Sequence, residues 1–157
     1  RIPYRDFINA GYCLACGNRT VDYGAIERFI MAIESKYGVT VMGIGYDRYN
    51  ALSTAQKLED AGYTMVEIKQ HSSVLHPATK WLAELVAEGN LVYEKGNKLL
   101  EINFENSRCV YDTNMNRYVN KKKSRGKVDM VVAGINAMYL LHQNYMLNST
   151  LDWVVQM

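Results

Sequence analysis

The chain has 157 residues, 48% of them hydrophobic and 22% charged, the size and composition of one globular domain with a buried core. No apolar run approaches the roughly 18–20 residues of a membrane helix, and no secretion signal opens the chain. The net charge of +2 by itself excludes neither nucleic acid nor protein as a partner. We predict one domain over residues 1–157, and the start at Arg1 indicates a longer or processed polypeptide.

The first part of the chain predicts a helix and then a buried strand. Residues 1–20 hold Pro and Gly without sustained periodicity and predict an irregular lead-in. Asp22 is a candidate N-cap for a helix over 23–37, where apolar residues recur at three- and four-residue steps before Gly38. The β-branched run 39–46 is apolar on both faces, which favours a parallel strand.

The next segment repeats this alternation. A helix is predicted over 50–61, ending at Gly62, and a strand over 63–68. Pro77 is predicted to open a third helix, which Gly89 closes. Helices that alternate with short apolar strands indicate an α/β domain with parallel strands.

The second half gives weaker signals until its last helix. Residues 91–93 predict a strand, 99–106 fit either a helix or a strand, and 108–111 predict another short strand. An apolar stripe predicts a long helix over 127–142. The tail, residues 143–157, is predicted to be irregular or a short terminal helix.

The three cysteines do not suggest a disulfide framework, so the reducing cytosol is the default compartment. Cys13 and Cys16 form a C-x-x-C, which invites a zinc or redox interpretation. Only Cys109 and three scattered histidines are left to complete such a site, and none has zinc spacing: His71, His76 and His142. We therefore interpret the C-x-x-C as structural or incidental.

The positive charge is concentrated in one segment. Residues 117–127 carry six basic side chains and no acid, which leaves twelve basic against sixteen acidic residues elsewhere. Such a segment can bind phosphates through counterion release. A solvated surface loop has the same composition, so both interpretations stay open.

Two aspartates occupy positions suited to a metal. Asp47 follows a predicted parallel strand, and ligands gather at the carboxyl ends of such strands. Asp129 lies in the first turn of the last helix, directly after the basic segment. Hard divalent cations prefer oxygen ligands, and aspartates from separate elements can hold a pair of them at a phosphodiester. The alternatives are a loop or cap residue at Asp47 and a favourable helix-terminal charge at Asp129.

The loop over residues 70–77 follows a strand and is expected at the same edge of the sheet as Asp47. Gln70, His71 and Ser72 are candidates to face a substrate there, although a lone histidine is more often structural. The sequence contains no Walker A, G-x-G-x-x-G, G-x-S-x-G or HExxH motif. These absences argue against a nucleotide site, a serine hydrolase or a zinc protease in this segment.

Several stretches follow one another in an order known from one family. They are PYRDFINAGYC, VDYGAIERFI, GIGYDRYNA, LEDAG, VEIKQHSSVLHPATKWLAELVAEGNL, the N-x-L-L at 97–100, Asn106 and KVDMVVAGINAMYLL. This series covers nearly all of residues 3–141 and resembles the large terminase subunit of tailed phages, in the subgroup that resembles that of phage HK97. The match is to its C-terminal nuclease domain.

The resemblance implies an RNase H-like α/β fold with a central mixed sheet flanked by helices. In this family an antiparallel meander precedes parallel strands that alternate with helices. Its catalytic acids lie on the first strand, at the end of the fourth, and near the start of the last helix. The second and third acids correspond to Asp47 and Asp129. The family's asparagine corresponds to Asn106, a supporting residue, and its substrate-loop glutamine to Gln70, beside His71.

The first acid of the family belongs to a G-x-D strand that would precede Arg1, and residues 1–20 do not supply it. Asp6 follows Pro-Tyr in the lead-in and is therefore on the wrong element. The ATPase domain would lie further upstream. We therefore expect a partial domain that lacks the N-terminal strands and one metal ligand and whose own metal binding is weak, and the sequence does not tell whether it is active.

The function that the resemblance implies is a metal-dependent endonuclease that cuts concatemeric double-stranded phage DNA by two-metal hydrolysis. Asp47 and Asp129 would hold Mg²⁺ or Mn²⁺. Five basic residues would contact DNA phosphates: Lys121, Lys122, Lys123, Arg125 and Lys127. The expected partners are DNA, a small terminase subunit and the portal, in the cytoplasm of the bacterial host. The alternatives are a non-catalytic DNA-binding or interaction module and another RNase H-like nuclease of resolvase or transposase type.

Overall fold

A computed structural model describes the backbone of residues 2–155 and the side chains of residues 2–144. The chain divides into two compact units, Arg1–Glu67 and Ile68–Met157. Each unit contains helices and one two-stranded sheet. No helix in the described part of the chain is both long and apolar enough to cross a membrane.

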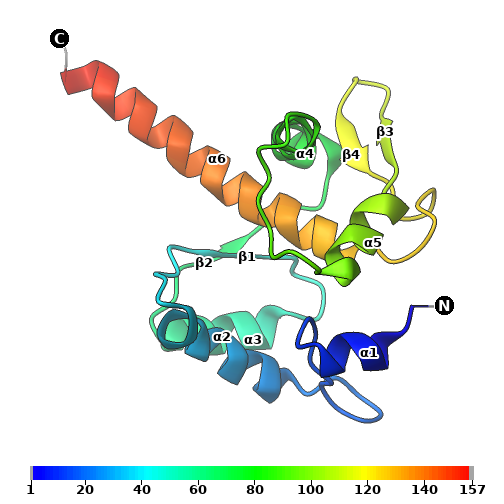
Figure 1. The fold of residues 1–157 in the computed structure, drawn as a ribbon. Helices are drawn as coiled ribbons and strands as arrows, with labels where there is room; N and C mark the ends of the chain where they lie inside the picture. Colours follow the sequence, from blue (N-terminus) through cyan, green and yellow to red (C-terminus); the bar gives the residue numbers. More distant parts are fainter. Residues whose placement is uncertain (1, 156–157) are drawn as a thin grey trace. The chain divides into compact units, whose positions relative to one another are not determined.

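The first unit combines three helices with one parallel strand pair (Figure 1). Its elements are α1 (Tyr4–Asn9), α2 (Tyr23–Tyr37), β1 (Ile44–Tyr46), α3 (Leu52–Asp60) and β2 (Met65–Glu67). In the strand pair Ile44 lies opposite Met65 and Tyr46 opposite Glu67. The predicted alternation of helix and parallel strand is confirmed here.

Local signals set the ends of α2 as predicted. The Asp22 carboxylate accepts a hydrogen bond from the Ala25 N–H at 3.0 Å, and Gly38 takes the left-handed conformation with φ of 64°. The predicted strand over 39–46 is shortened to its last three residues. Because the Val41 N–H donates to the Glu34 carboxylate at 2.8 Å, that part of the backbone is bonded to α2 instead of to a strand.

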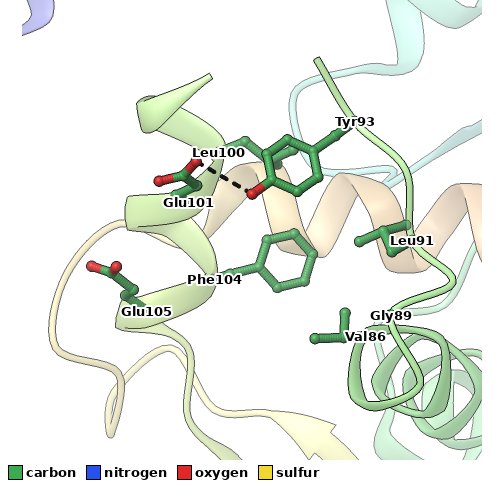
Figure 2. A pocket seen from close by; sticks show the side chains of 8 residues that line it. All are labelled: Val86, Gly89, Leu91, Tyr93, Leu100, Glu101, Phe104 and Glu105. Carbon is green, nitrogen blue, oxygen red and sulfur yellow. Dashed lines mark hydrogen bonds between the residues drawn. The ribbon is translucent and has the colours of Figure 1, made fainter. Parts of the chain in front are cut away.

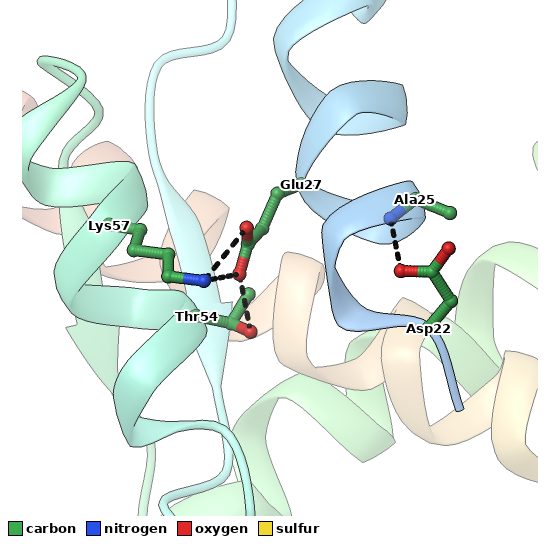
Figure 3. A network of polar contacts seen from close by, with 5 residues as sticks. All are labelled: Asp22, Ala25, Glu27, Thr54 and Lys57. Carbon is green, nitrogen blue, oxygen red and sulfur yellow. Dashed lines mark hydrogen bonds and ion pairs between the residues drawn. The ribbon is translucent and has the colours of Figure 1, made fainter. Parts of the chain in front are cut away.

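A polar contact joins α2 to α3 (Figure 3). The Glu27 carboxylate accepts hydrogen bonds from the Thr54 hydroxyl at 3.1 Å and from the Lys57 ammonium at 3.2 Å. The Glu27 side chain is only 12% exposed, so its charge requires these partners. The lead-in over 1–20, predicted to be irregular, instead contains the short helix α1.

The second unit places an antiparallel hairpin among three helices (Figure 1). Its elements are α4 (Ser72–Ala87), α5 (Lys98–Asn106), β3 (Cys109–Tyr111), β4 (Arg117–Val119) and α6 (Asp129–Val155). The core lies between α4 and α6, where Ala78 and Leu82 meet Val131 and Ile135. All four side chains are at most 6% exposed, so this contact forms a buried apolar cluster that joins the two helices.

The start of α4 was predicted five residues too late. Proline is favoured in the first turn of a helix, but Pro77 here lies inside α4. The helix begins earlier because the His71 ring nitrogen Nδ1 accepts a hydrogen bond from the Ser73 N–H at 3.3 Å. Pro77 has no N–H to give to the Ser73 carbonyl, a loss that this long helix tolerates.

Other predictions in this unit were partly wrong. Residues 91–93 do not form a strand, the ambiguous 99–106 region is helical, and β4 lies unpredicted inside the basic segment. The tail, predicted to be irregular or a separate short helix, continues α6 to Val155, while residues 156–157 lie outside the described part. The α/β class is confirmed in the coarser sense of a mostly helical chain with small sheets.

Replacing Ile135 by Ala should lower the free energy of unfolding by about 2–5 kcal/mol, because it removes three buried carbons from the α4–α6 core. The measurement is urea denaturation followed by circular dichroism. Leu141→Ala, on the same helix but 53% exposed, is the matched control and should change stability by under about 1 kcal/mol. Equal losses in both variants would contradict this account of the core.

Candidate metal centre and nucleic-acid interface

The start of α6 is capped by a side chain from another helix. Val128 precedes the helix and has no side-chain acceptor, and it is only 2% exposed. The Met130 N–H instead donates to the Asn103 amide oxygen of α5 at 3.2 Å. Asn103, 3% exposed, also donates from its amide nitrogen to the Leu99 carbonyl at 2.9 Å. One buried asparagine thus fixes where α6 begins.

Asp129, the first residue of α6, carries an exposed carboxylate. Its side chain is 66% exposed, and the Lys121 ammonium lies 3.4 Å from one carboxylate oxygen. An ion pair this exposed contributes little to stability and exchanges readily with solvent. The carboxylate is therefore available to a cation, and it stands at the positive end of the helix.

The basic segment forms an ordered loop, residues 120–127, which we call the basic loop. The Asn120 side-chain oxygen accepts hydrogen bonds from the N–H groups of Lys122 and Lys123, both at 3.0 Å. The Asn120 carbonyl accepts the Ser124 hydroxyl at 2.8 Å, and its N–H donates to the Arg108 carbonyl at 2.8 Å. Five basic residues are consequently held exposed around this turn: Lys121, Lys122, Lys123, Arg125 and Lys127.

Asn106, at the end of α5, holds the other side of the basic loop. Its amide nitrogen donates to the Lys127 carbonyl at 3.2 Å, and its carbonyl accepts the Arg125 N–H at 3.0 Å. Gly126 lies against this amide so closely that a Cβ there would come within 2.7 Å of the amide nitrogen. The predicted supporting residue thus joins the basic loop to the start of α6.

Asp47 belongs to the first unit and directly follows β1, as the sequence predicted. Its carboxylate accepts a hydrogen bond from the Tyr49 N–H at 3.2 Å, and the side chain is exposed. The second carboxylate oxygen has no hydrogen-bond donor among the described residues. Asp47 therefore shapes its loop with one oxygen and presents the other to solvent.

Gln70 and His71 occupy distinct positions before α4. Gln70 donates to the Ile68 carbonyl at 3.0 Å and to the side-chain oxygen of Asn136 on α6 at 3.2 Å. His71 caps α4, so its Nδ1 is already engaged with Ser73. The loop predicted to face a substrate is tied to α6 by Gln70, while the histidine has a structural contact at one ring nitrogen.

Residues 1–144 match the family described as the terminase large subunit, endonuclease domain. The chain belongs to this family. The predicted resemblance is thereby confirmed, in preference to a resolvase or transposase.

The terminase fold is also found among solved structures. The structure titled "Crystal structure of the HK97 bacteriophage large terminase" superposes with a TM-score of 0.76 at 23% identity. The match covers 88% of this chain and 29% of that one, so the chain spans less than a third of that terminase. A comparison with curated proteins gives no match.

The terminase domain contains a further polar centre that the sequence interpretation missed. The Asp112 carboxylate accepts the Ser72 hydroxyl at 2.6 Å, the Asn116 amide at 3.0 Å and the Asn114 N–H at 2.8 Å. The Ser72 hydrogen bond, followed by those from Asn116, holds the pKa of Asp112 well below its ordinary value. Its oxygens are already occupied, so the centre ties the β3–β4 turn to α4. The sequence DTNMN, dense in turn-forming residues, was the available signal.

The cysteines of this terminase domain are free thiols. Cys16 donates to the Asp22 carbonyl at 2.9 Å, next to the cap of α2. Within the described residues, no group of three or more histidines, cysteines or acids is arranged to hold a metal.

Replacing Gly126 by Ala should destabilise the domain by about 1 kcal/mol, because the new methyl displaces the Asn106 amide from the Lys127 carbonyl. Gly134→Ala, inside α6 with nothing near the added methyl, should instead stabilise it by about 0.5–1 kcal/mol. Thermal unfolding of the two variants measures both effects. A stabilised Gly126→Ala protein would contradict the proposed clamp.

Proposed function

We propose that this chain is the metal-dependent endonuclease part of a phage packaging terminase that cuts concatemeric double-stranded DNA. The observation that carries the proposal is an exposed carboxylate, Asp129, at the start of a helix and beside an ordered loop of five cations. A phosphodiester is the substrate that requires both a divalent cation and positive charge around it. The RNase H-like architecture is part of the same proposal.

The donor chemistry of Asp47 and Asp129 fits Mg²⁺ or Mn²⁺. Both are exposed carboxylates, and each keeps an oxygen that no described residue engages. When bound, a pair of such ions supplies an activated water and charge stabilisation at the leaving 3′ oxygen. Asp47 and Asp129 are the proposed ligands, and Asn106 positions the segment from which Asp129 projects.

The basic loop is the proposed contact with DNA. Lys121, Lys122 and Lys123 follow Asn120 in a hydrogen-bonded turn, so their backbone is ordered before DNA arrives. Ordering beforehand lowers the entropic penalty of binding. Lys121 also pairs with the Asp129 carboxylate at 3.4 Å, so it would balance the charge of Asp129 until a metal were bound and would then be available to a phosphate. In the parent protein the further partners are a small terminase subunit and the portal, in the bacterial cytoplasm.

A non-catalytic DNA-binding module is the second candidate. It is favoured by the exposed cations alone, since they would bind DNA whether or not a metal is present. The two candidates differ in whether DNA cleavage requires the carboxylates of Asp47 and Asp129.

In the longest polypeptide that carries this chain, Asp47→Asn and Asp129→Asn should each reduce Mn²⁺-dependent plasmid nicking at least about a hundredfold, as loss of metal-centred stabilisation requires. Asp60→Asn, an exposed aspartate at the end of α3, is the matched control and should leave nicking unchanged. In the 157-residue chain, Mn²⁺ should broaden the NMR signals of Asp47 and Asp129 selectively. Full nicking in both variants would reject the nuclease site and leave the binding module.

Replacing Lys121, Lys122 and Lys123 together by Gln should weaken DNA binding and flatten its salt dependence. If each lysine contacts one phosphate, the slope of log K against log salt falls by about 0.9 per residue. Fluorescence anisotropy of a labelled duplex at several salt concentrations measures the slope. The control removes the same charge at three exposed lysines outside the loop: Lys36, Lys80 and Lys95. Equal slopes for the two triple variants would mean that binding follows net charge only.

A further inference from the structure

The second unit contains a cavity of about 260 Å³ beneath α6. Helices α4, α5 and α6 and the β3–β4 hairpin all contribute to its wall. Most of the wall is apolar, with Leu82, Phe104, Val119, Val131 and Ile135 among the lining side chains. A compact apolar body fits such a wall better than water, which needs several polar partners.

Two of the residues that line this cavity each have a buried polar atom without a hydrogen-bond partner among the described residues. These atoms are the Thr79 hydroxyl oxygen and the Arg117 Nε, and Thr79 is only 3% exposed. Burying a polar group without a partner is unfavourable, so each calls for a partner from outside the chain. The backbone of Arg117 is fixed, because its N–H donates to the His76 Nδ1 at 2.7 Å.

The positive charge of Arg117 indicates which chemical class of ligand the cavity would bind. No carboxylate of the described residues pairs with its guanidinium, in contrast to the pairs formed by Arg28 or Lys57. Both unpartnered groups can donate a hydrogen bond, so the ligand must supply acceptors, and a half-buried cation favours an anionic one. We propose that this cavity binds a small organic carboxylate whose compact apolar body lies against the wall beneath α6.

A neighbouring pocket determines how such a ligand is oriented (Figure 2). It shares Val86 and Phe104 with the cavity, and Glu101 and Glu105 project from the α5 side of this pocket. The acidic side repels a carboxylate, while Tyr93 and Leu100 offer apolar surface there. The carboxylate therefore points to Arg117 and Thr79, and the apolar body points toward Phe104.

The first test uses benzoate as the probe on the 157-residue chain. Cys109 lines the cavity and is exposed, so its alkylation by iodoacetamide reports occupancy, with Cys13 and Cys16 as internal references. Saturating benzoate should slow alkylation of Cys109 at least about fivefold relative to these references. Benzyl alcohol, which has the same ring without the charge, should need at least about a tenfold higher concentration for half-maximal protection, as loss of a charge-assisted bond predicts.

The second test uses Thr79→Val, which replaces the unpartnered hydroxyl by a methyl of similar size. The free variant should unfold at a higher temperature, by roughly 2–4 °C, while its benzoate affinity falls about tenfold. Arg117→Met should remove the preference for benzoate over benzyl alcohol. Thr113→Val, exposed in the β3–β4 turn, is the control and should change neither property.

Three outcomes would overturn the proposal. The first is equal protection by benzoate and benzyl alcohol, which would indicate an unspecific apolar cavity. The second is no protection of Cys109 at all, which would leave water as the content of the cavity. The third is a Thr79→Val protein with unchanged benzoate affinity, and this stable variant keeps the test decisive even if Arg117→Met does not fold.

Discussion

The start of the long helix of the second unit depends on one hydrogen bond, from the Met130 N–H to the side chain of the buried Asn103. Val128, just before α6, and Val131 and Ile135 within it are 2–3% exposed, so one side of the helix start is buried while Asp129 faces water. Backbone N–H groups in the first turn need acceptors, and the Val128 side chain offers none. Asn103 of α5 supplies the acceptor, so α5 lies against the first turn of α6. The segment that connects the two helices must then return to the point where it started.

The hydrogen bonds that close the basic loop explain how five cationic side chains can lie within eight residues. Asn106 and Asn120 hold the backbone of the basic loop through neutral amides, so the cationic side chains are not needed for this and stay exposed, Lys121 beside Asp129. The cations therefore repel one another at high dielectric, where the penalty is small. Asp129 sits at the positive end of the helix and beside Lys121, so its charge is stabilised without burial.

Sequence reasoning succeeded where the signals are local and failed where contacts join distant residues. The cap at Asp22 and the strand end before Asp47 depend on neighbouring residues, and both were predicted. By contrast, the cap of α6 comes from Asn103, 27 residues before Met130. The spacing of apolar residues along the chain does not indicate a contact between residues so far apart in sequence. The strand β4 was not predicted, because it lies in a basic segment that does not show the alternation of apolar and polar residues typical of a strand. The candidate roles of Asp47, Asp129 and Asn106 stay predictions from the resemblance.

The helical repeat of α6 sets the distance between two of its polar residues, Asp129 and Asn136. Asn136 lies seven residues after Asp129, which places both on the same face of the helix, about 10 Å apart along its axis. Because Gln70 donates to Asn136 at 3.2 Å, the loop before α4 is held at that distance from the carboxylate. Such a separation is too long for two ligands of one metal, whose oxygen ligands lie within about 2–3 Å of the ion. The loop before α4 is thus set apart from the Asp129 carboxylate, and the roles of Gln70 and Asp129 stay predictions.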